Sequence, residues 1–349
     1  MPPSAGVSRQ GERVATIPTR KLGTDGPEVS AIGLGAMGMS DLYGPADEQE
    51  SVATLHAAID AGVNLIDTGD FYGSGHNEML IGRALRERRR EDVVISVKFG
   101  SRRTPDGAFQ PVPYDVSPAA VKDRLAYSLR RLGTDYIDIY RPARLNREIP
   151  IEETVGALLE MRQAGYIRHI GLSEVGPETL RRAAAVAPIS DLQIEYSLVS
   201  RGPENAIIPA LRELGIGLTA YGVLSRGLLS GHWTPERELA AGDFRANSPR
   251  FQGENLEANL RLVGALSRIA ERIGATTSQV AIAWVAARGD DIVPLVGARR
   301  RDRLTESLAA VALTLDEDVV AEIEAAVPAG AAAGSRYAAP LMATLDSEN

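Results

Sequence analysis

Three residues near two predicted strand ends have types and a spacing suited to acid–base chemistry. Asp67 and Tyr72 follow a short apolar strand, VNLID over 63–67, and Lys98 closes the next one, VVISVK over 93–98. A free tyrosine has a pKa of about 10 and is a poor acid at neutral pH. A nearby ammonium favours the phenolate and lowers that pKa, and a carboxylate keeps the ammonium charged and aimed. Such a trio is a usable proton donor to a carbonyl oxygen.

A second interpretation of the same residues needs no catalysis. Asp67 and Lys98 could form an ion pair that ties two strand ends together, and Tyr72 could be an ordinary loop aromatic. The spacing alone leaves both interpretations open. Both interpretations require the strands that carry Asp67 and Lys98 to lie side by side, which depends on the fold of the whole chain.

Eight short and mostly apolar segments alternate with helical patterns, which predicts a parallel sheet covered by helices. A count of eight suits a (β/α)8 TIM barrel, which takes about 250 residues plus insertions. The carboxyl ends of its strands form one face, where barrel enzymes carry their chemistry. That face would bring Asp67, Tyr72 and Lys98 together. The predicted strands are 29–35, 63–67, 93–98, 136–140, 167–173, 191–196, 216–221 and 291–296.

The chain is predicted to form one domain with extended loops after strands 3 and 7, over 99–116 and about 222–257. No boundary divides it in two. We expect a flexible N-terminal extension over 1–19, the barrel over 20–327 and a C-terminal tail over 328–349.

Composition excludes several classes of protein. The chain has 349 residues, 44% of them hydrophobic and 24% charged, which is ordinary globular composition. It has no cysteine and only four scattered histidines, so we expect no disulfide and no metal centre. A net charge of −8 argues against a nucleic-acid partner. There is no signal peptide and no apolar run of about 20 residues, so we expect a cytoplasmic protein with no membrane partner.

One motif points to a different fold. GLGAMG at 33–38 matches G-x-G-x-x-G, the fingerprint of a Rossmann nucleotide site. That fingerprint needs a helix to open at once, so that its N-terminus meets the pyrophosphate. Here the turn-rich MSDLYGPAD delays the helix to about residue 48, and Asp67 comes too late for the acidic partner. The Rossmann alternative is therefore disfavoured.

The stretch NLIDTGDFYGSGHNEMLIGRAL, with VVISVKFG after it, closely resembles the aldo-keto reductase superfamily. The resemblance runs from about Arg20 to about Leu315, with the motifs in the family's order. It implies a (β/α)8 barrel, NAD(P)H bound without a Rossmann fold, and reversible carbonyl reduction. By the match, Tyr72 is the general acid, Lys98 the lysine that depresses its pKa, and Asp67 the carboxylate paired with that lysine.

The resemblance also implies a nicotinamide site. Ser173 and Gln193 match the pair that hydrogen-bonds the carboxamide, and Tyr221 matches the aromatic that stacks on the ring. Without the resemblance, Gln193 and Tyr221 would be taken for ordinary core and rim residues. The turn beside the ribose and the loop that crosses the pyrophosphate match Gly35, Ala36, Met37, Gly222, Val223, Leu224, Ser225, Arg226, Gly227 and Leu228.

Four arginines lie at a predicted junction between a strand and a helix, in the segment VGARRRDRLTES at 296–307. A helix N-terminus favours anions and guanidinium groups fit phosphate, although such a charge run is usually a solvated turn. The position matches the family's adenosine 2′-phosphate site, which favours NADPH (NADP+) as the cofactor. Arg226 could reach the same phosphate. The matched positions are Gly297, Arg299, Arg303, Glu306 and Ser307, the last being Asn in most of the family.

The segment YIDIYRPARLN departs from the family, which usually has His at position 143. Ala143 cannot donate a hydrogen bond, and losing one such donor typically costs about 10²–10³ in rate. Arg141 and Pro142 also depart from the family pattern, which favours a natural subfamily over a single engineered change. The space could admit a water or a bulkier substrate, and Arg141 or Arg144 could supply the donor.

These observations predict an NADPH-dependent reductase that converts a ketone or aldehyde to an alcohol. The absent imidazole leaves an alternative from another class: an NADPH-binding regulatory module with vestigial activity, as in the potassium-channel β subunits that the family includes. The identity of the small-molecule substrate and the oligomeric state are not readable from the sequence, and a homo-oligomer stays open.

Overall fold

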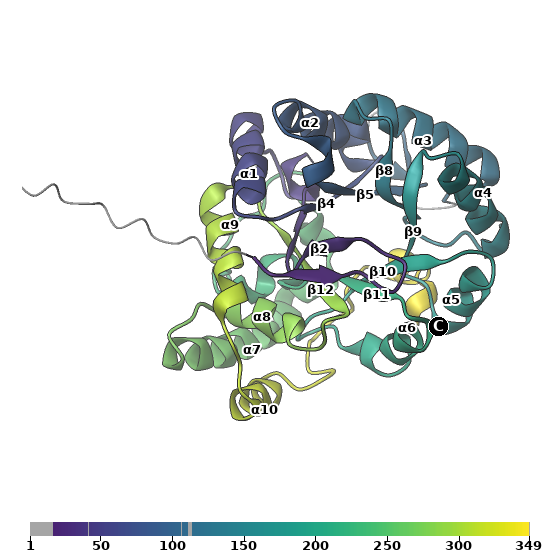
Figure 1. Cartoon of the computed structure of the whole chain (residues 1–349). Helices are drawn as coiled ribbons and strands as arrows, with labels where there is room; N and C mark the ends of the chain where they lie inside the picture. The colour runs from purple at the N-terminus through teal and green to yellow at the C-terminus, as the bar shows by residue number, and fades with distance from the viewer. Residues whose placement is uncertain (1–16, 41, 106, 111–113, 349) are drawn as a thin grey trace, which may run out of the picture.

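The computed structural model describes residues 17–40, 42–105, 107–110 and 114–348. Most of the predicted N-terminal extension, residues 1–16, lies outside this description. Eight parallel strands close a barrel in the order β10-β11-β12-β3-β4-β5-β8-β9, which confirms the predicted fold (Figure 1). The strands are β3 (Gly33–Gly35), β4 (Leu65–Gly69), β5 (Val94–Phe99), β8 (Ile137–Pro142), β9 (Ile167–Ser173), β10 (Ile189–Glu195), β11 (Gly217–Tyr221) and β12 (Ile292–Gly297).

Helices form the outer layer around the barrel (Figure 1). Local signals fix several of their ends. Ser117 Oγ accepts the Ala120 N–H at the start of α3, and Thr276 with Gln279 forms a capping box at the start of α8. Gly133 ends α3 in the left-handed conformation. The outer helices are α1 (Glu48–Asp60), α2 (His76–Leu85), α3 (Pro118–Leu132), α4 (Ile151–Gln163), α5 (Pro177–Ala184), α6 (Ile207–Leu214), α8 (Thr277–Ala286), α9 (Arg301–Leu308) and α10 (Glu317–Ala326).

The first predicted strand is wrong, because 29–35 contains two strands with different partners. β2 (Glu28–Ser30) pairs antiparallel with β1 (Thr19–Lys21), and only the following β3 joins the barrel. This hairpin covers the amino ends of the strands, where a small apolar cluster fills the barrel. The cluster consists of Leu22, Val29, Leu65, Ile139 and Val293.

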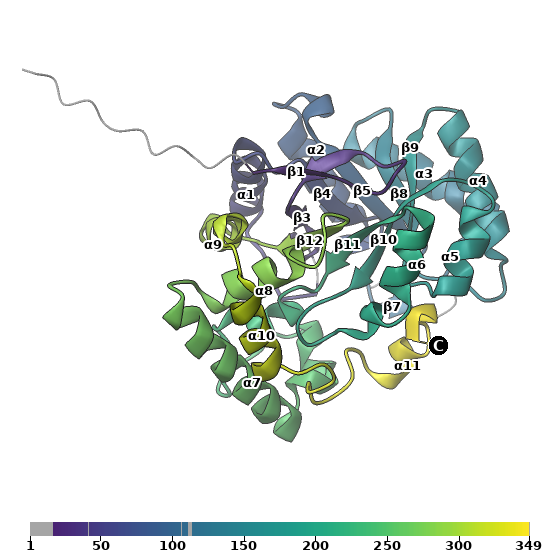
Figure 2. The ribbon, with the colours of Figure 1, turned by 60° about the horizontal axis from the view of Figure 1, so that its bottom comes forward.

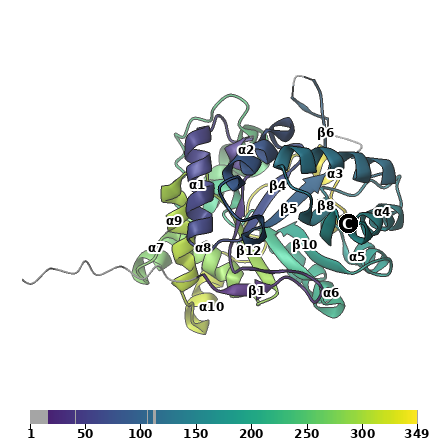
Figure 3. The same ribbon diagram turned by 45° about the horizontal axis from the view of Figure 1, so that its top comes forward.

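The two extended loops are present at the carboxyl ends of β5 and β11. The first holds a short hairpin, β6 (Arg102–Arg103) with β7 (Phe109–Gln110), which stands out from the body in Figure 3. The second contains the 3-10 turns η5 (Ser225–Ser230), η6 (Phe244–Asn247) and η7 (Pro249–Phe251). It then enters α7 (Gly253–Arg272), a helix that the sequence interpretation did not predict.

The C-terminal segment folds back onto the barrel. After α10 it runs to α11 (Ala339–Met342) and η9 (Asp346–Glu348), and Figure 2 shows this end (yellow) beside α5. The Asp346 carboxylate accepts hydrogen bonds from Gly176 N at 2.8 Å and Thr179 Oγ1 at 2.7 Å, at the start of α5. None of the helices described combines the length and the apolar character needed to cross a membrane.

Candidate active site

The three predicted acid–base residues meet at the carboxyl end of the barrel. Lys98 Nζ donates a hydrogen bond to Asp67 Oδ1 and lies 5.2 Å from the centroid of the Tyr72 ring. Asp67 Oδ2 accepts from Ser96 Oγ at 2.8 Å and from Gln193 Nε2 at 2.8 Å. Asp67, Tyr72 and Lys98 are all buried. A carboxylate held by three donors therefore fixes the ammonium beside the phenol. We call Asp67, Tyr72 and Lys98 the floor of the barrel mouth.

Strand register and one turn produce this arrangement. β4 and β5 pair with Asp67 opposite Ser96 and Gly69 opposite Lys98. After β4 the chain passes through the 3-10 turn η2 (Tyr72–Gly75), where Gly73, Ser74 and Gly75 have φ of 55°, 54° and 95°. Two of these three left-handed positions are glycines, which adopt them without steric cost. The turn leads directly into α2 and leaves Tyr72 at the mouth of the barrel.

The pKa of Tyr72 differs from the sequence expectation. Burial raises the pKa of the phenol well above 10, and the negative charge of Asp67 adds to the rise, while the positive charge of Arg144 opposes it. Burial also lowers the pKa of Lys98, which Asp67 counteracts. The lowering of the Tyr72 pKa by Lys98 stays a prediction, and burial is the larger influence in this geometry. The phenol keeps its proton at neutral pH and can donate it.

Arg141, one of the two candidate replacements for the absent imidazole, points into the barrel. Its Nη1 donates to Asp191 Oδ2 at 2.8 Å and its Nη2 to Ser96 Oγ at 3.1 Å, and the residue is fully buried. β8 also runs two residues beyond the predicted 136–140, since the Ala143 N–H still bonds the Phe99 carbonyl at 2.8 Å. Arg141 supports the barrel interior and does not reach the mouth.

The residues matched to the nicotinamide lie around the floor. The Ala36 N–H donates to the Asp67 carbonyl at 2.9 Å, and Gly35 pairs with both Asp67 and Gly297. Met37 begins the 3-10 turn η1 (Met37–Met39). Ser173 and Gln193 are partners in the β9–β10 register. The Ser173 hydroxyl is buried and has no hydrogen-bond partner among the described residues, so it is open to a ligand amide.

The predicted pyrophosphate loop after β11 has an unusual backbone. Ser225, Arg226 and Gly227 follow one another with φ of 44°, 57° and 94°. Successive N–H groups in such turns can form an anion-binding concavity. In the described part of the chain, Ser225 Oγ and Arg226 Nη1 are buried without a partner. Val223 and Leu228 are side chains of the hydrophobic core, so from them only the backbone is available to a ligand.

The arginines of the turn between β12 and α9 fall into two sets, those paired on the surface and those near the predicted phosphate site. Arg300 pairs with Asp302 and Arg301 with Glu50, both on the surface. Arg299 instead donates to the Tyr43 carbonyl at 3.1 Å. The other positions matched to the phosphate site are close by: Arg303 bonds Glu306 at 3.0 Å and contacts His232, while Ser307 is buried behind them.

Two further arginines of the β11 loop, Arg237 and Arg245, lie near the predicted phosphate site. The sequence interpretation missed both. Burial lowers the pKa of Arg299, and the charge of Arg245 lowers it further. Burial likewise lowers the pKa of Arg237, with Arg245, Arg299 and Arg303 among the repelling charges. Asp243, which bonds Arg245 at 2.6 Å, offsets part of this repulsion, and the remaining positive charge favours a bound anion. The only sequence signal was the recurrence of arginine along 226–250.

A buried charge network surrounds the mouth and was also missed. Arg336 donates to both oxygens of Glu174, at 2.8 and 2.6 Å, and lies 3.8 Å from Glu195. Arg226 and Arg250 bond Glu195 at 2.9 and 3.3 Å. All five residues are nearly inaccessible to solvent. We call this network the rim; it consists of Glu174, Glu195, Arg226, Arg250 and Arg336.

Tyr221, matched to the aromatic that stacks on the nicotinamide, is fixed by the rim. Its hydroxyl donates to Glu174 Oε1 at 2.7 Å and lies 2.9 Å from the Tyr337 hydroxyl. The Arg226 guanidinium lies 4.5 Å from the centroid of the Tyr337 ring. The C-terminal segment therefore reaches the mouth through Arg336 and Tyr337.

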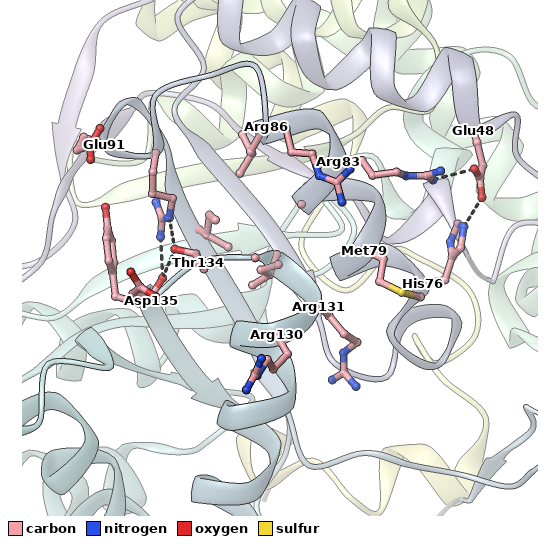
Figure 4. Close-up of a pocket in the computed structure, with 17 residues that line it drawn as sticks. Glu48, His76, Met79, Arg83, Arg86, Glu91, Arg130, Arg131, Thr134 and Asp135 are labelled. Carbon is pink, nitrogen blue, oxygen red and sulfur yellow. Dashed lines mark hydrogen bonds and ion pairs between the residues drawn. The ribbon is translucent and has the colours of Figure 1, made fainter.

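A separate hollow of about 830 Å³ lies on the outer layer between α2 and α3 (Figure 4). It carries an ion-pair group in which Glu48 bonds His76 at 2.6 Å and Arg83 at 2.7 Å. None of its lining residues is a predicted catalytic or cofactor residue. The barrel mouth, and not this hollow, holds the candidate chemistry.

The structure is a (β/α)8 barrel with a buried tyrosine, an ion-paired lysine and a cluster of arginines at one mouth, the face where barrel enzymes carry their chemistry. Residues 31–328 match the Aldo/keto reductase family. The chain belongs to this family and is an oxidoreductase.

Similar proteins agree with this assignment. "Probable aldo-keto reductase 1" of Glycine max is 40% identical over 326 residues, covering 93% of this chain and 92% of that protein. "Aldo-keto reductase yakc [NADP(+)]" of Schizosaccharomyces pombe is also 40% identical over 326 residues, covering 92% and 95%. The solved glycerol dehydrogenase of Gluconobacter oxydans superposes with a TM-score of 0.80 at 30% identity, covering 89% of this chain and 96% of its own.

Proposed function

We propose that the protein reduces a ketone or an aldehyde to the corresponding alcohol, reversibly, with NADPH as the reductant. One observation carries the proposal: a buried Tyr72 beside the Lys98–Asp67 ion pair at the mouth of the barrel. The family membership supports carbonyl reduction in general.

The floor residues take distinct roles in this proposal. Tyr72 gives its O–H proton to the carbonyl oxygen as the carbonyl carbon is reduced. The Lys98 ammonium then stabilises the phenolate that remains, because it lies 5.2 Å from the centre of the ring. Asp67 fixes the ammonium and is itself held by Ser96 and Gln193.

The cofactor residues keep the roles that the resemblance implies. Bound NADPH would supply a hydride from nicotinamide C4. The open hydroxyl of Ser173 suits its carboxamide. Arg299 and Arg303, among mutually repelling cations, suit the 2′-phosphate that NADH lacks. The relative from Schizosaccharomyces pombe carries NADP(+) in its name, which supports the same cofactor.

The test is a panel of aldehydes and ketones with NADPH, followed by absorbance at the nicotinamide band. We expect turnover by wild type and a loss of about 10²–10⁴ in kcat for Tyr72→Phe, the usual range for a general acid. NADPH affinity, measured by fluorescence titration, should stay unchanged. A Phe variant as fast as wild type would overturn the mechanism. A higher kcat/KM with NADH than with NADPH would overturn the cofactor.

A second candidate function is favoured by Ala143, which leaves the mouth without the family's usual imidazole. In that case the protein is an NADPH-binding regulatory module with vestigial activity. Saturable NADPH oxidation at about 1 s⁻¹ or faster with any carbonyl compound would exclude it. NADPH binding without turnover across aldehydes, ketosteroids, keto-sugars and pyridoxal would support it.

A further inference from the structure

Arg144 is the residue next to Ala143, and its side chain turns back over the end of β8. Its Nη1 donates to the Ala143 carbonyl oxygen at 2.6 Å. Its Nη2 lies 3.5 Å from the Tyr337 hydroxyl, which in turn lies 2.9 Å from the Tyr221 hydroxyl. The guanidinium therefore sits between the backbone carbonyl of Ala143 and the Tyr337 hydroxyl, which contacts the tyrosine matched to the nicotinamide.

Arg144 forms no ion pair with a carboxylate within the described part of the chain, although Arg144 and Glu174 act on each other electrostatically. Arg141 has Asp191, Arg226 and Arg250 share Glu195, and Arg336 has Glu174. No carboxylate lies within ion-pair distance of Arg144 among the described residues. A guanidinium has five N–H donors, and two are used here, one by the Ala143 carbonyl and one, at a longer distance, by the Tyr337 hydroxyl. The remaining donors are available to a ligand.

The field of Arg144 reaches the floor. Its positive charge is the leading influence that opposes the raised pKa of Tyr72, and it also contributes to the lowered pKa of Lys98. An oxygen that accepts the Tyr72 proton is thus within the field of a second, cationic donor.

We propose that Arg144 replaces the absent imidazole as the second hydrogen-bond donor to the substrate's carbonyl oxygen. This inference rests on the proposed function. The hydride adds to the carbonyl carbon, the π electron pair of the carbonyl moves to oxygen, and the Tyr72 proton completes the alcohol. Arg144 stays protonated throughout and stabilises the negative charge that builds on oxygen. The Tyr72 phenolate regains its proton from water, so one carbonyl, one hydride and one proton yield one alcohol.

The test compares Arg144→Met and Arg144→Lys with the control Arg147→Met. Arg147 is an exposed arginine on the same loop, so its variant should match wild type. We expect Arg144→Met to lose about 10²-fold in kcat, as for loss of an oxyanion donor, and Arg144→Lys to lose less. NADPH affinity should change little. Millimolar guanidinium chloride should restore part of the rate of Arg144→Ala, which a structural role would not allow.

The outcomes separate the two proposals. No turnover by wild type on any carbonyl overturns the proposed function, and this inference with it. Turnover that is lost in Tyr72→Phe but kept within threefold in Arg144→Met overturns this inference alone. The role of Arg144 as a donor also fails if the loss in Arg144→Met comes from weaker NADPH binding, or if guanidinium restores nothing to Arg144→Ala.

Discussion

The floor and the rim of the barrel mouth are built in different ways. The floor joins Asp67, Tyr72 and Lys98 through two adjacent strands and one tight turn, within 98 residues of the start of the chain. The rim joins the ends of β9 and β10 to the β11 loop and to Arg336, which is 162 residues beyond its partner Glu174. Short-range elements fix the floor, whereas long-range docking makes the rim. We therefore expect the floor to set the rate of the reaction and the rim to set the stability of the mouth.

The largest effect should follow from removing the floor ammonium. Lys98→Met leaves Asp67 buried without its cation and removes the ammonium that lies 5.2 Å from the centroid of the Tyr72 ring. We expect kcat for carbonyl reduction to fall by about 10²–10⁴, as for loss of general acid function. Steady-state kinetics with saturating NADPH measures it. If kcat stays within tenfold of wild type, the floor does not set the rate, and the contrast with the rim fails.

Removing the rim cation should act on stability. Arg336→Met leaves the Glu174 carboxylate buried without its main partner, which typically costs about 3–5 kcal/mol. Urea unfolding measures the loss. The control is Arg300→Met, which breaks an ion pair on the surface and should change stability little. Equal stability of the two variants would mean that the rim is no more than a surface network.

A pH titration sharpens the same contrast. Burial raises the pKa of Glu174, but Arg336 and Arg144 outweigh it and bring the pKa to about 2. An unfolded glutamate has a pKa of about 4.3. Because the folded pKa is depressed, the stability from this carboxylate is complete above about pH 5 and is lost as the pH falls toward 2. In urea unfolding between pH 5 and 3, Glu174→Gln should show a shallower decline than wild type. If stability falls with pH as steeply in Glu174→Gln as in wild type, groups other than Glu174 cause the loss of stability in acid.

The smallest effect concerns the boundary between the two regions. Ala143→His would fill the space that the absent ring leaves at the mouth. If that space accepts large substrates, the variant should lose more kcat/KM on bulky ketones than on small aldehydes, by a few-fold. Equal losses on both classes, measured side by side, would show that the space is not used by substrate.

The floor was predictable because its residues fall at strand ends, and eight alternating apolar segments fix where strand ends meet. The first strand was misjudged because Val29 and Gly35 lie in one apolar run, although a turn at 31–32 gives its halves different partners. α7 was missed because no side chain caps its start, and Gly253 and Gly264 weaken its pattern. Its apolar spacing at Leu256, Leu260 and Val263 was still a usable signal.

The rim was not predictable by the same means. Glu174 and Arg336 carry no motif, and only the folded chain brings them together. The choice between Arg141 and Arg144 was equally hidden, since both lie at the same strand end. Barrel closure directs Arg141 inward to Asp191 and leaves Arg144 over the mouth. The alternation of residues along a strand predicts which face each side chain occupies. It does not predict whether a long side chain at the end of the strand folds back over the mouth.

The position of the C-terminal segment has a consequence for how the protein is made. Tyr337 meets Tyr221 at the mouth, and Ser347 Oγ bonds Glu174 at 2.7 Å. The ribosome releases the eight barrel strands well before it releases these residues. A chain whose barrel strands have closed therefore still lacks a finished mouth until these later residues dock.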